Sequence, residues 1–521
     1  MIRARSVLCI QLEYHIPLFL FSQVFPRYFS AHRLLLLTFP RPGRNIARLY
    51  PNVRKHSVRG FAVKRAHEID FSEGRLLPKL ISFAVPVMLS GVLQLAFNAA
   101  DLIVVGRFDG DTALAAVGSN GALVELLINL LMGLGTGASV LAARYFGARD
   151  DRRMGETVET AALTGAVGGL LFTLLGIAVS GPMLRLMNTP AEVLPLASVY
   201  LRIYFLGIPF LAVYNFLSAV LRSVGDTERP LLYMTVAGVV NVLLNLLLVA
   251  VFHLGVVGVA AATVASEILS CFLTVRCLLR NEGSCRLPRG RLHFSRVQFL
   301  QMLRIGLPAG IQGILFSISN VIVQSSFNTF GAAVVAGNAA ACSLEGFPNR
   351  AQDSVGQAAL AAVGQCMGAR QYDQVKTVMR TCCLLAAAVS LSVYGVMILL
   401  RGPLLHIYTD DPAALEAAVS RFFVLGCTYF TFGLMCAMTC VLRGLGFSVL
   451  PTAISLVGIC GLRLAWIFTV FARSHKLYLL YACYPLSWTV TAVGLYIAYV
   501  CLRGRAIREN ESRYAREHPA G

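Results

Sequence analysis

Long blocks of apolar residues are the feature that most restricts how this chain can fold. Residues 76–106, 113–143, 231–254 and 382–400 form such blocks. Each approaches or exceeds the roughly 20 residues that a helix needs to cross about 30 Å of hydrocarbon. Only 14% of the 521 residues are charged, against roughly 25% in soluble proteins. The chain is therefore predicted to be an integral membrane protein.

The expected fold is all-α, with about twelve membrane-spanning helices. Short connectors between neighbouring blocks leave about eleven or thirteen spans as alternatives. The predicted spans are 76–106, 113–143, 157–180, 191–221, 229–252, 256–279, 297–328, 332–367, 375–400, 412–442, 450–472 and 478–502.

The formal net charge of +19 would suggest nucleic-acid binding in a soluble protein. In this chain most basic residues beyond residue 70 lie in the connectors after even-numbered spans and in the C-terminal tail. The positive-inside rule then places both termini in the cytoplasm of a multi-pass protein of the cell (inner) membrane. No nucleic-acid partner is expected. The connectors after odd-numbered spans contain only Arg107, Arg185, Arg401, Arg473 and Lys476.

Residues 1–70 differ in composition from the rest of the chain. They are strongly basic, and their apolar patches, 16–25 and 34–37, are too short to span a membrane. We interpret this segment as an N-terminal extension that is disordered or reflects a start assigned too early, with Val63 as the alternative start.

Separate regions of the sequence recur at a nearly constant spacing, close to half the length of the apolar part of the chain. The triplet Gly-Ala-Arg at 147–149 recurs at 368–370, Leu-Arg at 221–222 recurs at 442–443, and Pro86 recurs as Pro308. This spacing predicts two related six-helix lobes, as in transporters built from parallel repeats. We assign residues 71–290 to an N-lobe, 291–505 to a C-lobe and 506–521 to a cytoplasmic tail.

Residues 69–502 resemble the multidrug and toxic compound extrusion (MATE) family. The resemblance implies an antiporter that couples the efflux of drugs or metabolites to inward movement of H⁺ or Na⁺. The similar segments are 68–74, 85–86, 97–101, 105–108, 142–148 and 221–226, with second-half copies at 306–308 and 364–369.

Asp101 is the predicted centre of ion coupling. A carboxylate within a membrane span costs about 2.5–3.5 kcal/mol to insert and usually marks an ion or substrate path. The resemblance implies that Asn241, Asn245 and Thr263 surround it. Asn245 stands where many relatives have an Asp, which leaves H⁺ and Na⁺ open as the coupling ion. A Na⁺ ion at Asp101 is the only metal ion expected, and no cofactor is expected.

Polar residues at helical spacing in both lobes are predicted to line a substrate cleft, and Pro86 is predicted to be a hinge in the first span. Arg463, within span 11, is expected to be structural and to pair with a backbone carbonyl or a carboxylate. The alternatives for Glu345 are a pair with Arg350 or a position at a helix end. The predicted cleft residues are Gln94, Asn98, Glu267, Gln312, Asn320 and Glu345.

The expected function is therefore cation-coupled export of drugs or small organic cations by a monomer that alternates access between the two sides. The sequence contains no G-x-x-x-x-G-K-[ST] motif, which excludes ATP-driven transport by this chain alone. A membrane-embedded enzyme is disfavoured because no catalytic cluster stands out. The main alternative is a lipid-linked oligosaccharide flippase of the related superfamily.

Overall fold

The computed structural model describes residues 68–187, 189–281, 283–288, 290 and 292–517. Residues 65–521 form one compact unit, which contains every element described here. The predicted N-terminal extension lies outside the described residues, apart from residues 68–70.

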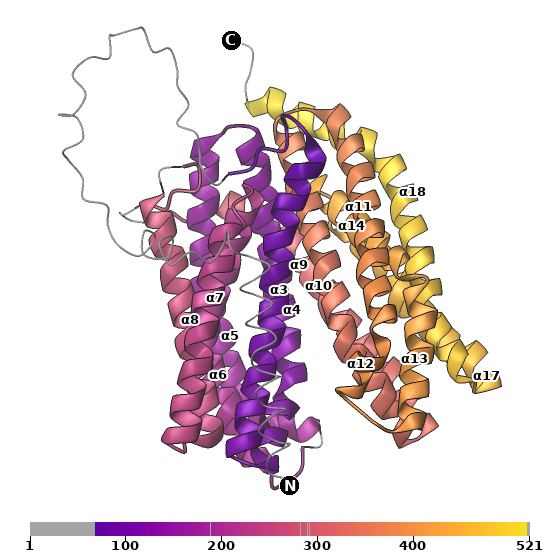
Figure 1. Ribbon diagram of the computed structural model, residues 1–521. Coiled ribbons are helices and arrows are strands. Elements are labelled where there is room, and N and C mark those ends of the chain that lie inside the picture. Colours follow the sequence, from indigo (N-terminus) through magenta and orange to yellow (C-terminus); the bar gives the residue numbers. More distant parts are fainter. Residues whose placement is uncertain (1–67, 188, 282, 289, 291, 518–521) are drawn as a thin grey trace, which may run out of the picture. The chain divides into compact units, whose positions relative to one another are not determined.

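The N-lobe consists of six long helices (Figure 1). The fifth continues into a π-helical segment, Leu246–Val251, in which the backbone hydrogen bonds lengthen by one residue. The six are α3 (Leu76–Phe108), α4 (Asp111–Gly147), α5 (Asp151–Leu186), α6 (Leu194–Ser223), α7 (Glu228–Asn245) and α8 (Gly255–Arg280).

The C-lobe repeats this order with more interruptions. The span expected at 412–442 consists of two helices, and the span expected at 450–472 alternates between α- and π-helix, with π segments at Leu456–Gly461 and Ile467–Phe471. The helices are α9 (Arg296–Phe327), α10 (Ala332–Gly368), α11 (Tyr372–Leu399), α12 (Arg401–His406), α13 (Pro412–Gly426), α14 (Tyr429–Gly444), α15 (Val449–Ser455), α16 (Leu462–Trp466), α17 (Ala472–Ser474) and α18 (Leu477–Glu517).

Every predicted span coincides with helix in the structure. Ten spans among the described residues are long and apolar enough to cross a membrane, and α13 with α14, bent by 53°, makes an eleventh. Helix α10 covers the remaining predicted span, but it carries Glu345, Arg350 and Asp353 in its middle. Helix α18 continues to Glu517, so most of the expected C-terminal tail is helical.

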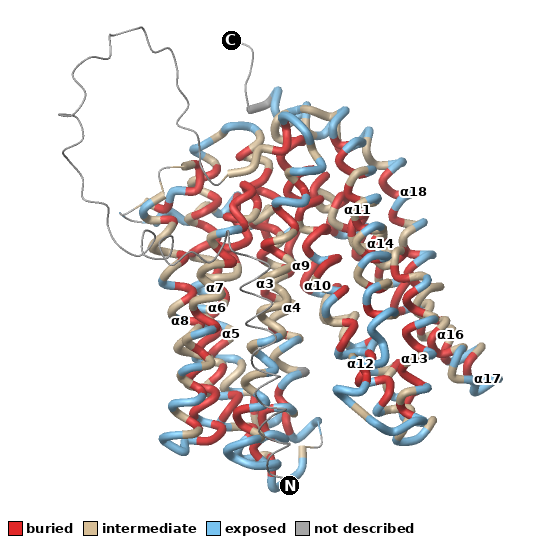
Figure 2. The backbone as a smooth tube through the Cα atoms, viewed as in Figure 1, coloured by how far each residue is buried: buried red, intermediate tan, exposed pale blue. Residues whose placement is uncertain are grey.

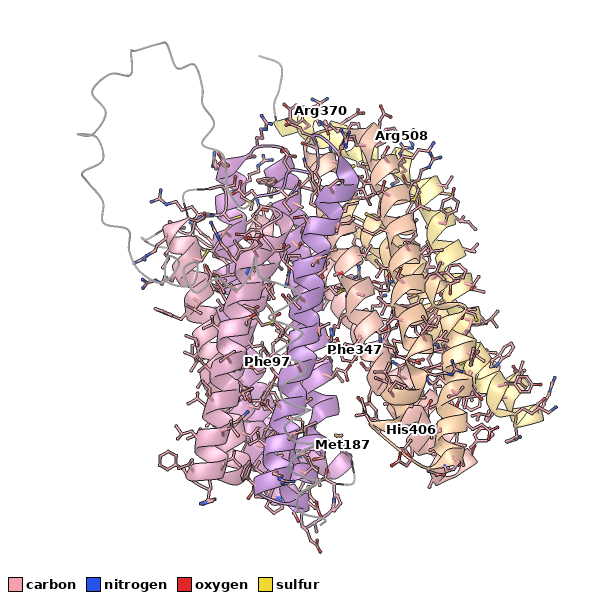
Figure 3. The ribbon with its side chains drawn as sticks, viewed as in Figure 1. Phe97, Met187, Phe347, Arg370, His406 and Arg508 are labelled. Atoms are coloured by element: carbon pink, nitrogen blue, oxygen red, sulfur yellow. The ribbon has the colours of Figure 1, made fainter. Side chains whose placement is uncertain are left out.

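The surface of the helices fits a lipid environment. Leu171 and Leu174 on α5 are 62% and 61% exposed, and buried residues follow the inner faces of the helices (Figure 2). A membrane protein exposes apolar side chains in this way because lipid, unlike water, does not penalise them. Figure 3 shows Arg370 and Arg508 at one end of the helices and Met187 and His406 towards the other.

The first helix of each lobe packs on the second helix of the other lobe, α3 on α10 and α9 on α4. Glycines on α4 permit close packing on both α9 and α10. A Cβ on Gly133 would lie 2.2 Å from the backbone nitrogen of Gly310 in α9, and a Cβ on Gly147 would lie 2.1 Å from the Gln365 carbonyl oxygen in α10. The packing of α4 on the C-lobe therefore extends to the end of α4 at Gly147, beside the connector to α5.

Candidate functional site

The four residues predicted to couple the ion lie together inside the N-lobe. Asn245 Nδ2 donates a hydrogen bond to Asp101 Oδ1 at 2.5 Å and lies 3.3 Å from Asn241 Oδ1. Asn241 Nδ2 lies 3.5 Å from the Thr263 hydroxyl, which donates to the Val259 carbonyl. Helices α3, α7 and α8 thus each contribute to a shared polar cluster, called the Asp101 cluster below.

Local helix geometry explains how the cluster forms. Asn241 and Asn245 are one helical turn apart and therefore share a face of α7. The π-helical segment begins immediately after Asn245, and such segments are frequent at functional sites. Gly238, also on α7, leaves room for the ring of Phe97 on α3, because a Cβ on Gly238 would lie 1.9 Å from that ring. Helix α3 can therefore come close to α7.

The cluster contains one carboxylate, which can take up a proton or bind a cation, and neutral oxygen atoms, which can bind a cation. Asn245 is fully buried, and its Oδ1 has no hydrogen-bond partner in the described part of the chain. An unsatisfied buried acceptor is costly, and here it lies beside the Asp101 carboxylate. Hard cations such as Na⁺ bind oxygen ligands of this kind, so the donor set fits either ion.

Glu267 lies one turn beyond Thr263 on α8 and is buried. Its carboxylate lies against α6, where a Cβ on Gly207 would be 2.0 Å from Oε2. This Oε2 has no hydrogen-bond partner among the residues that the structure describes. The structure thus places Glu267 inside the N-lobe, against α6.

Gln94 and Asn98 precede Asp101 on α3, Gln94 being half-buried and Asn98 exposed. Asn98 lies near the helix face that carries Gly91. A Cβ on Gly91 would lie 2.9 Å from the Arg350 side chain, so this face of α3 packs on α10. Pro86 is buried within α3, which continues as one helix from Leu76 to Phe108. Proline removes one backbone hydrogen bond there, and the hinge stays a prediction.

The predicted C-lobe residues are not brought together in the same way. Gln312 is buried and accepts hydrogen bonds from Arg443 Nη2 at 2.8 Å and from the Thr452 hydroxyl at 3.1 Å. Asn320 is exposed, and its Oδ1 accepts from Arg463 Nη1 at 3.1 Å.

Glu345 forms a buried ion pair whose partner the sequence analysis missed. Arg421 donates from Nε and Nη2 to the two carboxylate oxygens at 2.8 and 2.7 Å, and Tyr394 donates at 3.2 Å. The suggested pair with Arg350 is wrong, because Arg350 pairs with Asp353 at 3.7 Å. The signal for Arg421 was its charge within the apolar segment 412–442.

The expectation for Arg463 also needs correction. Its donors reach neither a backbone carbonyl nor a carboxylate in the described residues. Nε donates to the Ser487 hydroxyl at 3.1 Å and Nη1 to Asn320, while the guanidinium lies over the Tyr484 ring at 4.3 Å.

The chain resembles known membrane transporters throughout its two lobes. The MatE family matches residues 86–247 and again residues 308–469, which confirms the predicted repeat. The probable multidrug resistance protein YoeA of Bacillus subtilis is 30% identical over 433 residues, which cover 80% of this chain and 92% of YoeA. The probable multidrug resistance protein NorM of Thermotoga maritima is 24% identical over 391 residues, covering 74% of this chain and 84% of NorM.

The fold is also that of a solved transporter. A structure described as the outward-facing conformation of a multidrug resistance MATE family transporter of the MOP superfamily superposes with a TM-score of 0.79. The identity is 20%, and the match covers 85% of this chain and 100% of that chain. This likeness confirms the predicted membrane architecture.

Proposed function

Because this chain belongs to the MATE family of multidrug transporters, we propose that it is a cation-coupled antiporter. It exports drugs or small organic cations across the cell (inner) membrane by alternating access. The observation that carries the proposal is the Asp101 cluster, in which one carboxylate and three neutral side chains meet inside a membrane-spanning lobe.

A proton or Na⁺ entering the cluster changes what the Asp101 carboxylate contacts. Asn245 now directs its amide nitrogen at Asp101. A Na⁺ ion would require oxygen ligands instead, and rotation of the Asn245 amide by half a turn would present its unpartnered Oδ1. A proton would neutralise the carboxylate and weaken its hydrogen bond with Asn245, because charge-assisted bonds are the stronger ones.

Helix α3 connects this change to the contact between the lobes. It packs on α7 and α8 within the N-lobe and on α10 of the C-lobe. Asp101 lies roughly 22 Å along the helix from Pro86, at about 1.5 Å of rise for each residue. A shift of α3 about Pro86 would therefore alter how the first helix of the N-lobe packs on α10.

The driving force is sufficient for export. A membrane potential of about 100 mV supplies about 2.3 kcal/mol for each charge that moves across it, which corresponds to a concentration ratio of roughly 50. Net entry of one positive charge in each transport cycle would reach this ratio.

Ethidium transport in everted membrane vesicles tests the proposal, with pH and Na⁺ gradients imposed separately on wild type and Asp101→Asn. Asn occupies nearly the same volume but takes up no proton and carries no charge. We expect one gradient to drive ethidium transport in the wild type and Asp101→Asn to abolish it. Transport that survives the substitution would move coupling to another residue. If neither gradient drives any cationic dye, the flippase alternative replaces export.

A further inference from the structure

The C-lobe contains a counterpart of the Asp101 cluster with the opposite charge. The repeat relates Asn98 to Asn320, and the two family matches, 86–247 and 308–469, are in register at both ends and relate Asn241 to Arg463. Thr263 and Tyr484 both lie on the last helix of their lobe, α8 and α18. The counterpart of Asp101 is Val323, so the carboxylate is lost while an arginine is gained. The first, fifth and sixth spans of each lobe therefore contribute to a polar cluster, once around an acid and once around a base.

This second site, the Arg463 cluster, consists of Arg463, Asn320, Tyr484 and Ser487. Arg463 is only 4% exposed. Its Nε and Nη1 donate to neutral oxygens of Ser487 and Asn320, both at 3.1 Å. The Tyr484 ring centre lies 4.3 Å from the guanidinium, in a geometry that favours a cation over an aromatic face.

No carboxylate pairs with Arg463 in the part of the chain that the structure describes. Arg421 shows the contrast within the same lobe, because two hydrogen bonds join it to Glu345 and a third, at 2.6 Å, joins it to Asn338. A charged side chain in a membrane span is costly unless it is paired. Neutral hydrogen-bond acceptors orient Arg463 without cancelling its charge.

The surroundings of Arg463 suit an aromatic acid. Asn320 is exposed and Tyr484 is half-buried, so the cluster reaches the protein surface. The ring centres of Tyr484 and Trp488 lie 5.8 Å apart, and those of Trp488 and Phe432 lie 5.2 Å apart. A guanidinium offers a planar fork of donors that matches a carboxylate. The half-buried rings of Tyr484 and Phe432 can pack on an aromatic substrate, while Trp488, 5% exposed, packs behind them.

We propose that the Arg463 cluster binds a carboxylate group on the transported substrate. This inference rests on the proposed export function and narrows its substrate class. The preferred substrates are amphipathic aromatic zwitterions, which carry a carboxylate in addition to the positive charge of an organic cation. The substrate acid supplies the counter-charge that Arg463 lacks in the protein.

Equilibrium binding to the purified full-length chain in detergent, without an ion gradient, tests this inference. The probes are a rhodamine dye with a free carboxylate and the methyl ester of the same dye, each followed by fluorescence anisotropy. The two dyes share the cationic ring system and differ only in the acid. We expect wild type to bind the acid at least about tenfold more tightly than the ester, a difference of about 1.4 kcal/mol.

Arg463→Gln should remove this preference. It should weaken binding of the acid dye at least about tenfold and change binding of the ester by less than about twofold. Arg463→Lys should keep part of the preference, since it retains the charge but loses the fork. Arg473→Gln is the matched control, because it removes an exposed arginine from the far end of the same span. It should leave the affinity for both dyes unchanged.

Two results would refute the carboxylate subsite and leave the proposed export intact. Either wild type binds both dyes with equal affinity, or Arg463→Lys and Arg463→Gln weaken binding of both dyes to the same extent. The second result would assign Arg463 a purely structural role. Failure of wild type to bind either dye would instead refute this inference together with the proposed export of such compounds.

Discussion

Gln365 and Arg144 occupy equivalent positions in the two repeats, and each donates a hydrogen bond to a backbone carbonyl of the other lobe. Gln365 Nε2 donates to the Ser223 carbonyl at 2.9 Å, and Arg144 Nη2 to the Gly444 carbonyl at 3.3 Å. The two acceptors are themselves equivalent positions of the repeat. The lobes are thus joined by a reciprocal pair of bonds, which must break if the lobes separate at this end.

Gln365→Leu is expected to loosen this junction. Gln365 Oε1 also accepts from the Phe71 backbone N–H at 2.8 Å, and this N–H is buried. Loss of a buried partner costs about 1–3 kcal/mol, so hydrogen exchange at Phe71 should accelerate about tenfold or more. Hydrogen-exchange mass spectrometry measures this rate. Thr381→Val, which removes only an exposed, local hydrogen bond, is the control, and unchanged exchange in Gln365→Leu would refute the role of the bond.

Asn245→Asp is expected to strengthen Na⁺ binding at the Asp101 cluster. The new carboxylate would lie within hydrogen-bond distance of Asp101, and two adjacent carboxylates repel each other unless a cation or a proton lies between them. The rise in melting temperature on adding Na⁺, with choline as the control ion, measures binding through linkage. We expect Na⁺ to raise the melting temperature of Asn245→Asp more than that of wild type. In Asn245→Leu, Na⁺ should no longer raise the melting temperature. An equal rise in all three proteins would place Na⁺ elsewhere.

Breaking the buried pair of Glu345 and Arg421 should destabilise the C-lobe strongly. Glu345→Leu leaves Arg421 charged and unpaired in a site where it is 2% exposed, and removing one partner of such a pair costs about 3–5 kcal/mol. Substituting both residues by Leu removes both charges and should cost clearly less than the sum of the single changes. Thermal unfolding of the purified variants measures these effects. Strict additivity would show that the two side chains do not stabilise each other.

Asp226, in the connector between α6 and α7, should make stability depend on pH. Burial raises its pKa to about 7, although Arg229, 3.4 Å away, acts in the opposite direction. The folded protein therefore binds a proton that the unfolded chain releases near its ordinary pKa of 3.8. The contribution of Asp226 to stability consequently falls as pH rises from about 4 to about 7.

Asp226→Asn should flatten this part of the pH profile and make the variant relatively more stable at high pH. Asn retains an oxygen that can accept from the Arg229 backbone N–H. Melting temperatures between about pH 5 and pH 8 measure the slope, since this window includes the upper part of the titration. Asp410→Asn removes an exposed charge and serves as the control. A profile for Asp226→Asn parallel to that of wild type would contradict the prediction.

Much of the fold was predictable because it depends on local and periodic features. The apolar blocks predicted the position of every span. They did not predict the bend between α13 and α14, because a bend leaves the hydrophobicity of the segment unchanged. They did not predict the helical continuation of α18 either, because its residues beyond 502 are mostly polar and charged. The repeat was also legible in the sequence, since the two matches to the MatE family begin at residues 86 and 308.

The Asp101 cluster was predicted through resemblance, and the structure brings its four residues together, while their role in ion coupling stays a prediction. Side chains four residues apart on one helix share a face, so Asn241 and Asn245 could be placed side by side from the sequence. Whether that face meets Asp101 depends on how α7 packs on α3, which a single sequence does not specify.

The set of helices, their duplication and the polar faces that they carry can therefore be predicted from the residues alone. These properties follow from hydrophobicity and helical period, which depend only on residues that are close in the sequence. Side-chain partners that are far apart in the sequence, such as Glu345 with Arg421 and Arg463 with Asn320, depend on how the helices pack. Apolar helices pack in lipid with little preference from hydrophobicity alone, so small residues and polar contacts select one arrangement. In this arrangement one lobe holds an acid and the other holds an arginine whose partners are neutral.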